Sequence, residues 1–391
     1  MVPINTETPK GLLEVHGETL IERLIKQLHE VGITDIYVVV GFLKEQYEYL
    51  IDLYNVQLIV NPDYAIKNNL HSLILVSKYL SNTYICCADH YFINNPFIDN
   101  NIDNVSYRAC TYYSGKFSEF SVICSDADVI TRMEVGGTDS LAMVGPAYMN
   151  EKFSRVFCDL MQKEIMDFRV SSMFWEEFYA KHITELTFYK REFANNEILE
   201  FETIDDLRSF DSEFLMNVDS EIITNICNTL MCNPNDVTNI DVINAGLTNV
   251  SFSFSVNNIK YVYRHPGGTA GNLIDRRTEL FAQMKAKETG IDKSVIHMEL
   301  SGWKISYYVE GANECDFEKS DKQLITAMEY LHTLHNIKPD NTVKIFDNIV
   351  EGKKLMKIAS ATKGHLEKEF EGIINKVDKL YSYIKEDAKE L

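Results

Sequence analysis

Between residue 12 and about residue 90, short apolar runs alternate with amphipathic segments, and no other feature of the sequence constrains the fold as much. The pattern predicts strands at residues 12–15, 35–40, 56–60 and 84–88, with helices at 19–31, 45–53 and 70–80 between them. Such alternation favours a doubly wound α/β sheet, a Rossmann-like fold. Ligands of these sheets bind beyond the carboxyl ends of the strands, where Gly41, Asn61 and Asp89 stand.

The rest of the chain changes pattern twice. Its predicted elements are β-rich segments at 104–132, helices at 151–166 and 175–182, a strand at 198–202, helices at 203–210 and 219–231, and strands at 249–256 and 260–264. The last two strands flank Asn257-Asn258, a typical hairpin turn. We place the boundary after the helix at 203–210, which gives domains at 1–212 and 213–391.

Composition narrows the class of protein. With 391 residues, 45% hydrophobic and 11% aromatic, the chain can form two globular domains. No apolar run is long enough to cross a membrane, and the start, MVPINTETPK, is unlike a signal peptide, so we expect a cytoplasmic protein. A formal charge of −20 disfavours nucleic acid or an anionic membrane as partner. The eight cysteines form no CxxC pair and are expected to be reduced and buried.

One segment near the start places a cation beside a turn. It is TPKGLLEV, residues 8–15, followed by Gly17 and by LIE at 20–22. The segment resembles the part of nucleotide-sugar and phosphocholine nucleotidyltransferases that follows their Gly-rich phosphate loop. The resemblance gives Lys10 the role of binding phosphate, and a lysine suits a triphosphate that loses pyrophosphate.

Three later segments match the same family in order and spacing. They are NNLHSL at 68–73, YICCAD at 84–89 and ILEFE at 198–202. The first resembles the family's base-recognition segment, which implies that Asn68, Asn69 and Ser72 bind the nucleotide.

The second and third segments supply carboxylates. The resemblance implies that Asp89, as the catalytic aspartate, and Glu202 together hold Mg²⁺, a cation that prefers oxygen ligands. The family usually has Asp where Glu202 stands, so Glu200 is kept as the alternative ligand.

An aromatic group is a candidate for holding a quaternary ammonium through cation–π contacts. Its members, with two adjacent glutamates, are Tyr107, Tyr112, Tyr113, Phe174, Trp175, Glu176 and Glu177. Core packing is the favoured interpretation for most of them, and we select Trp175 alone as a substrate-binding residue.

The resemblance also sets an expectation about activity. Members of the family carry a strand and a GxGxR-type loop ahead of this first segment, and neither occurs in the sequence. The amides of such a loop would hold the triphosphate, so we expect weak transferase activity or none from this chain.

The second half contains another set of nucleotide-binding signals. They are NAGLTNVSF at 244–252, YVYR at 261–264, DRRTE at 275–279 and YYVEG at 307–311. They resemble the amino-terminal lobe and hinge of choline and ethanolamine kinases and their aminoglycoside-kinase relatives, an α+β protein-kinase-like fold.

The kinase resemblance implies roles for five residues. Gly246, Thr248 and Asn249 would cover the ATP phosphates, while Arg264 would contact them and pair with Glu279. The catalytic loop of these kinases does not occur in the sequence, so we expect this half to bind nucleotide without turning it over.

Together the resemblances imply a bacterial bifunctional protein. A kinase half would make phosphocholine from choline and ATP, and a transferase half would join it to CMP from CTP, giving CDP-choline and pyrophosphate, with Mg²⁺ as cofactor. Two alternatives stay open: a sugar-phosphate nucleotidyltransferase fused to a small-molecule kinase, and a non-catalytic nucleotide-binding regulatory protein.

Overall fold

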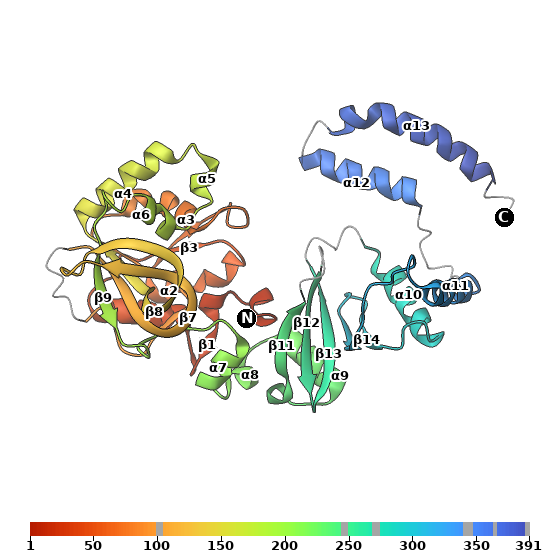
Figure 1. Cartoon of the computed structure of the whole chain (residues 1–391), viewed down its shortest axis with the longest axis horizontal. Helices are drawn as coiled ribbons and strands as arrows, with labels where there is room; N and C mark the ends of the chain where they lie inside the picture. Colours follow the sequence, from red (N-terminus) through yellow and green to blue (C-terminus); the bar gives the residue numbers. More distant parts are fainter. Residues whose placement is uncertain (99–104, 244–248, 268–273, 339–346, 363–365, 388–391) are drawn as a thin grey trace. The chain divides into compact units, whose positions relative to one another are not determined.

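The structure is a computed structural model that describes residues 1–98, 105–243, 249–267, 274–338, 347–362 and 366–387 (Figure 1). The chain forms two compact units, Met1–Asn225 and Ile226–Leu391. The division lies later than the boundary predicted after residue 212. One reason is that Glu7 accepts hydrogen bonds from the Ser220 hydroxyl and, at 3.2 Å, from the Ile222 amide, which ties the start of helix α9 (Glu221–Leu230) to the first unit.

The first unit opens with short elements. These are the 3-10 helices η1 (Ile4–Thr6) and η2 (Lys10–Leu12), the antiparallel strands β1 (Glu14–Val15) and β2 (Glu18–Thr19), and helix α1 (Leu20–Glu30). The strand predicted at 12–15 is present but shorter, since Leu12 still belongs to η2 and β1 begins at Glu14. His16 and Gly17, with φ of 52° and 80°, then reverse the chain into a tight hairpin with β2. The α1 prediction is confirmed, with Thr19 accepting a hydrogen bond from the Glu22 amide at the helix start.

The Rossmann-like part follows. Its elements are β3 (Tyr37–Val40), η3 (Lys44–Tyr47), α2 (Tyr49–Tyr54), β4 (Gln57–Val60), α3 (Asn69–Val76), η4 (Ser77–Tyr79), β5 (Thr83–Ile85) and β6 (His90–Phe92). Strands β3 and β4 are parallel, as the alternating pattern predicts. Strand β5, however, pairs antiparallel with β8 rather than with a parallel neighbour, because the long strands that follow occupy its edge.

A long antiparallel pair dominates the middle of the first unit. Strands β7 (Tyr107–Cys124) and β8 (Ile130–Met149) belong to a sheet of order β5-β8-β7-β9, with β9 at Tyr189–Phe193. A second pairing joins β10 (Ile198–Glu200) to β6 in antiparallel register. That pairing brings the late carboxylate segment back beside the end of β5, where the predicted site lies.

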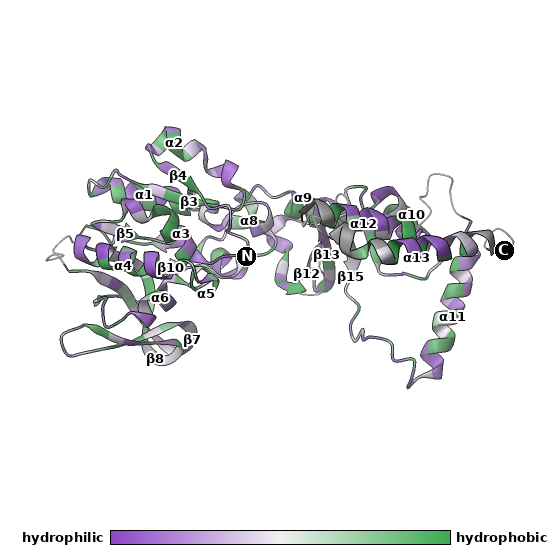
Figure 2. Ribbon diagram, turned by 90° about the horizontal axis from the view of Figure 1, so that it is seen from above, coloured by the Kyte–Doolittle hydropathy of each residue, from purple (hydrophilic) through white to green (hydrophobic). Residues whose placement is uncertain are grey.

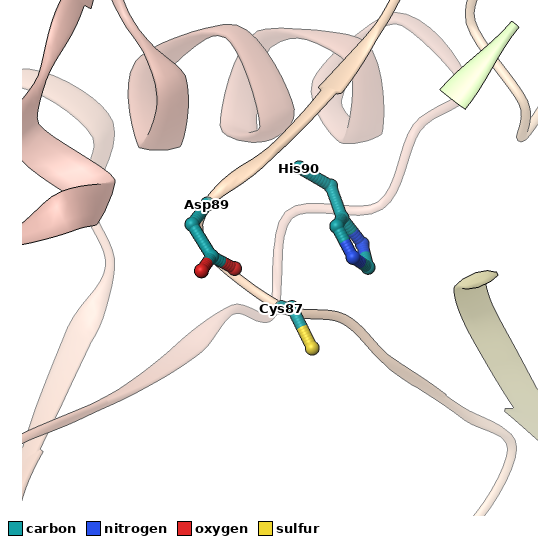
Figure 3. A group of neighbouring side chains, drawn as sticks. All are labelled: Cys87, Asp89 and His90. Carbon is teal, nitrogen blue, oxygen red and sulfur yellow. The ribbon is translucent and has the colours of Figure 1, made fainter. Parts of the chain in front are cut away.

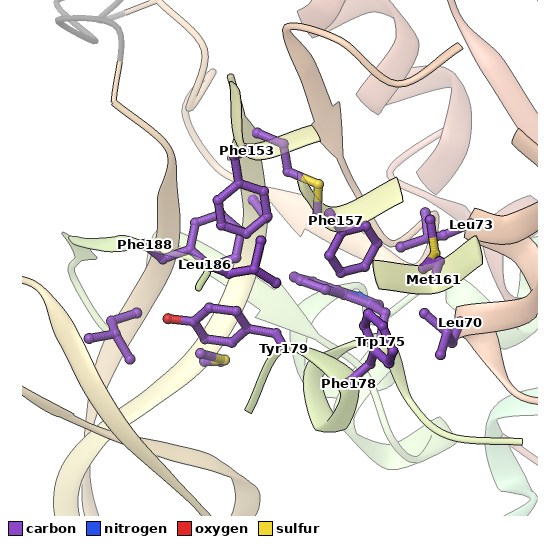
Figure 4. Packing of buried hydrophobic residues seen from close by; sticks show 14 of the residues in the cluster. Leu70, Leu73, Phe153, Phe157, Met161, Trp175, Phe178, Tyr179, Leu186 and Phe188 are labelled. Carbon is purple, nitrogen blue, oxygen red and sulfur yellow. The ribbon is translucent and has the colours of Figure 1, made fainter. Parts of the chain in front are cut away.

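Helices α4 (Glu151–Glu164), α5 (Phe168–Ser171) and α6 (Trp175–Lys181) pack with α3 and the sheet around an aromatic core (Figure 4). Phe153 and Phe188 stack there with ring centroids 4.2 Å apart, and Trp175 meets Phe188 edge-on. Aromatic side chains bury large apolar areas, so this cluster is the main stabilising element of the unit. Helices α7 (Ile204–Phe210) and α8 (Phe214–Asn217) close it.

The second unit contains an antiparallel sheet of order β11-β12-β13-β15-β14. After η5 (Pro234–Asp236), its strands and helices are β11 (Thr238–Ile243), β12 (Asn249–Val256), β13 (Ile259–Pro266), α10 (Arg276–Glu288), β14 (Val295–Met298), β15 (Lys304–Tyr307), α11 (Asp321–His335), α12 (Asn348–Thr362) and α13 (Leu366–Asp387). The predicted hairpin is confirmed: Asn257 and Asn258, both with positive φ, join β12 to β13.

The helices of the second unit carry both polar and apolar residues along their length, as Figure 2 shows for α11 and α13. Within the described ranges, no helix combines the length and the apolar character needed to span a bilayer.

Candidate active site

The centre of the site is one ammonium group between two carboxylates. Lys10, in η2, places its Nζ 3.7 Å from Oδ2 of Asp89 and 3.6 Å from Oε1 of Glu202. Asp89 follows β5 and Glu202 follows β10, so three segments distant in the sequence converge here. Lys10 and Asp89 are partly shielded, whereas Glu202 is largely exposed. The three residues predicted for phosphate and metal binding therefore lie together.

Close packing of Gly11 against Ala88 and Tyr47 fixes the position of the neighbouring Lys10. A Cβ built on Gly11 would lie 3.1 Å from the Cβ of Ala88 and 3.3 Å from the hydroxyl of Tyr47. Glycine is needed at this position because the chain bearing Lys10 touches the chain bearing Asp89. Burial, and secondarily the Asp89 charge, raises the pKa of Tyr47 to about 12, so its hydroxyl stays neutral beside the site.

Glu200, the alternative metal ligand, has another partner. It lies opposite His90 in the β6–β10 pairing, and its Oε2 is 3.5 Å from Nε2 of His90. Hydrogen bonding to His90 is the main cause that lowers the pKa of Glu200. Glu200 is thus held by His90, and Glu202 is the carboxylate that faces Lys10.

A mixed donor cluster adjoins this centre. Ligand atoms of Cys87, Asp89 and His90 all lie within 4.8 Å of one another (Figure 3). The Cys87 thiol is solvent-accessible, yet the protein around it, followed by the Asp89 charge, raises its pKa to about 12. All eight cysteines are free thiols, but Cys87 and Cys315 are exposed, so the prediction of uniformly buried cysteines was wrong.

The three predicted nucleotide-binding residues of α3 make contacts within the protein. Asn68 caps α3 and accepts a hydrogen bond from the Asn69 amide at 2.8 Å, and Asn69 accepts one from the Trp175 amide at 2.8 Å. The Ser72 hydroxyl accepts a hydrogen bond from the Asn61 side chain at 3.2 Å. Their contacts with a nucleotide base stay a prediction.

Trp175, the predicted substrate-binding residue, is 4% exposed and belongs to the aromatic core. The guanidinium of Arg108 lies 5.5 Å from its ring centroid and 3.7 Å from Oε1 of Glu176. Arg108 also donates to the Gly145 carbonyl. Desolvation by burial is the main cause that raises the pKa of Glu176, and Arg108 opposes it.

Sequence reasoning missed several residues that the structure brings to the site. His90 follows Asp89 directly and Cys87 precedes it by two positions. The run Cys87-Ala88-Asp89-His90 thus contains three metal-ligating residue types within four positions, a signal that the sequence does carry. Arg108 gave no signal, because a lone arginine in a β-rich segment reads as a surface residue.

The second unit holds the pair predicted for it. Nη2 of Arg264, on β13, donates to Oε1 of Glu279, on α10, at 2.7 Å, and Arg276 donates to Oε2 of Glu279 at 2.6 Å. Asn249 begins β12, while Gly246 and Thr248 lie outside the described residues. The Arg264–Glu279 pair thus joins sheet and helix as the kinase resemblance predicts.

Comparison with known proteins identifies the family of the first unit. Residues 5–135 match the family model described as the MobA-like NTP transferase domain. The chain is 31% identical over 215 residues, 55% of this chain and 93% of the relative, to a choline-phosphate cytidylyltransferase of Streptococcus pneumoniae. It is 30% identical over 227 residues, 55% of this chain and 88% of the relative, to a 2-aminoethylphosphonate cytidylyltransferase of Lancefieldella rimae.

A solved structure gives the same result. The CTP:phosphocholine cytidylyltransferase of Streptococcus pneumoniae superposes with a TM-score of 0.52 at 29% identity, over 54% of this chain and 92% of that one. The fold and the convergent lysine and carboxylates therefore define a nucleotidyltransferase of the Rossmann-like class. More narrowly, the chain belongs to the cytidylyltransferase family that contains these choline-phosphate and 2-aminoethylphosphonate enzymes.

Proposed function

We propose that the first unit transfers CMP from CTP to phosphocholine, giving CDP-choline and pyrophosphate. The observation that carries the proposal is the position of Lys10 between Asp89 and Glu202, in a chain whose relatives are named for this reaction. An acceptor phosphate oxygen would attack the α-phosphorus of CTP as the bond to the β-phosphate breaks.

Lys10 would bind the phosphates and offset the negative charge that increases in the transition state. Asp89 and Glu202 bring carboxylate oxygens to the same ammonium group, and carboxylate oxygens are the ligands that Mg²⁺ prefers. When bound, Mg²⁺ would neutralise phosphate charge. Tyr47 and Ala88 pack against Gly11, the residue after Lys10, and would hold the backbone so that the Lys10 ammonium stays beside Asp89.

The acceptor has one specific competitor. The 30% identity to a 2-aminoethylphosphonate cytidylyltransferase makes that phosphonate, or another amino-alcohol phosphate, the second candidate. Phosphocholine and 2-aminoethylphosphonate share a cationic nitrogen close to a phosphorus oxyanion. The proposed site would therefore recognise a short zwitterion, and a sugar phosphate lacks the cation.

The test is pyrophosphate release from CTP with Mg²⁺ and each acceptor in turn: phosphocholine, phosphoethanolamine, 2-aminoethylphosphonate and glucose 1-phosphate. Release with phosphocholine above the others supports the proposal, and a preference for 2-aminoethylphosphonate selects the competitor. Asp89→Ala should abolish release, whereas Asp52→Ala, an exposed aspartate on α2, should retain it. Release from the sugar phosphate alone would contradict an amino-alcohol acceptor.

For the second unit we propose nucleotide binding with the ATP phosphates at Arg264. The support is the pairing of Arg264 and Arg276 with a single glutamate, Glu279, which leaves more positive than negative charge at the junction of β13 and α10. Because the catalytic loop of the kinases it resembles does not occur in the sequence, the proposal for this unit is nucleotide binding without turnover.

A further inference from the structure

A second kind of metal chemistry is available where β5 ends. Cys87, Asp89 and His90 offer a sulfur, an oxygen and a nitrogen within 4.8 Å of one another (Figure 3). We propose that this cluster binds a thiophilic divalent cation such as Zn²⁺, and that a cation held there inhibits nucleotidyl transfer. The inhibitory part rests on the proposed function, because Asp89 serves both sites; the binding part does not.

The donor set distinguishes this site from the oxygen site of Asp89 and Glu202. Thiolate, imidazole and carboxylate are the ligands of Zn²⁺ and related cations, whereas Mg²⁺ takes oxygen ligands almost exclusively. Three protein ligands leave a fourth position for water or a phosphate oxygen. The same short segment can thus serve a hard cation through Asp89 and a soft one through Cys87 and His90.

His90 provides an independent indication of a ligand. The residue is buried, and its Nδ1 has no hydrogen-bond partner among the described residues. Its other ring nitrogen, Nε2, faces Oε2 of Glu200 at 3.5 Å. A proton on Nε2 leaves the lone pair of Nδ1 free for a metal, and ligating histidines commonly donate their other ring N–H to a carboxylate, as Nε2 would to Glu200 here. A buried ring nitrogen without a partner is costly, and a cation would satisfy it.

The thiol is accessible to an incoming ion. Cys87 is exposed, while the adjacent Cys86 packs with the hydrophobic cluster of Phe92 and Phe97, so this segment presents a single reachable sulfur. A cation bound there would also draw the Asp89 carboxylate away from Lys10, whose ammonium lies 3.7 Å from it. Loss of that pairing disturbs the arrangement proposed for catalysis.

Binding is tested by titrating the full chain with Co²⁺, whose thiolate complexes absorb in the near ultraviolet. We expect the charge-transfer band in the wild-type chain, its loss in Cys87→Ser, and an affinity at least about tenfold weaker in His90→Gln. Cys227→Ser is the matched control, since Cys227 is another partly accessible thiol with a neighbouring thiol, Cys232, and it should keep the band. A band that persists unchanged in Cys87→Ser overturns the proposal.

A second measurement needs no variant. Saturating Zn²⁺ should slow maleimide labelling of Cys87 in the wild-type chain at least about tenfold and leave Cys315 unaffected, as peptide mass spectrometry would show. Equal labelling of Cys87 with and without Zn²⁺ overturns the binding site even if the variants do not fold.

Inhibition is tested by pyrophosphate release with Mg²⁺, with and without Zn²⁺. Inhibition of the wild-type chain, but not of Cys87→Ser relative to its own zinc-free rate, supports the regulatory part. A chain that binds Co²⁺ through Cys87 yet turns over equally with Zn²⁺ overturns that part alone. A chain without the GxGxR-type loop is expected to release pyrophosphate slowly at best; absence of even slow release with Mg²⁺ at high enzyme concentration would count against the proposed function and leave the spectroscopic result standing.

Discussion

The ammonium of Lys10 lies 3.7 Å from the carboxylate of Asp89, although Lys10 begins η2 near the start of the chain and Asp89 follows β5. Glu202 approaches the same ammonium from a third segment at 3.6 Å. The lysine thus holds two like charges near each other in the absence of a metal ion. Its removal affects both phosphate binding and the positions of the carboxylates.

Lys10→Ala should lower kcat/KM for pyrophosphate release by about 10²–10³, the range seen when one preorganised electrostatic contact with a transition state is removed. Lys44→Ala is the control, because Lys44 pairs with Glu45 on the surface and should change the rate less than about twofold. Steady-state kinetics with CTP and phosphocholine decides the matter. Equal losses in both variants would mean that Lys10 acts only through the net charge of the protein and not through a contact with the substrate.

The buried pair of Arg108 and Glu176 predicts an effect of pH on stability. Desolvation raises the folded-state pKa of Glu176 above its ordinary value of 4.5. The folded state therefore holds this proton more tightly, and the stabilisation is present below 4.5 and lost as pH rises through the folded pKa. Relative to Glu176→Gln, the wild-type chain should lose free energy of unfolding over that window, by at most about 1.4 kcal/mol per pH unit.

Urea unfolding at several pH values would measure this difference. Trp175 fluorescence in a Trp303→Phe background reports the first unit by itself, since the sequence has two tryptophans. A difference that grows in favour of the wild type with rising pH would show that attraction to Arg108 outweighs the desolvation of Glu176.

Alanine substitutions at two glycines of the β7–β8 pair compare the cost of backbone strain alone with the cost of strain plus steric crowding. Gly115 has a φ of +81° with open space where a Cβ would lie, so Gly115→Ala should cost about 1–2 kcal/mol. Gly145 has a φ of +100°, and its Cβ would lie 2.5 Å from Cδ1 of Ile198. Gly145→Ala should therefore cost more than Gly115→Ala, by the amount needed to shift the end of the Ile198 side chain and to relieve the 3.1 Å approach to the Cβ of Ala109. Denaturation followed by Trp175 fluorescence measures both, and equal costs would refute the crowding.

In the second unit, Glu279→Gln should weaken binding of a fluorescent ATP analogue by several-fold. Glu279 accepts hydrogen bonds from both Arg264 and Arg276, so its neutralisation releases two guanidinium groups from their fixed positions. Arg277→Ala, an exposed arginine on the same helix, is the control and should bind as the wild type does. If Glu279→Gln binds the analogue more tightly, net charge rather than arginine placement governs the site.

Elements with local signals were predicted well. Thr19 and the apolar spacing of Ile21, Leu24 and Leu28 define α1, and Asn257-Asn258 defines the β12–β13 turn, because a cap and a turn depend on residues close in sequence. The pairing of β5 was not foreseen, since an apolar run does not reveal its neighbour or its direction.

The candidate site shows the same contrast between what can be predicted from the sequence and what depends on tertiary packing. Family resemblance selected Lys10, Asp89 and Glu202, which the structure places side by side. Core packing was the alternative for the aromatic group, and Trp175 is buried beside Arg108, a neighbour that the pattern did not indicate. Burial of an aromatic residue depends on tertiary packing, which composition does not record.

The contact between Gly11 and Ala88 makes the two positions interdependent. Their backbones are close enough that a Cβ at residue 11 would lie 3.1 Å from the Cβ already present at residue 88. A methyl group on each side therefore requires one of the two backbones to move by a few tenths of an ångström. Gly11→Ala paired with Ala88→Gly should be tolerated better than Gly11→Ala by itself, because the paired change removes this contact.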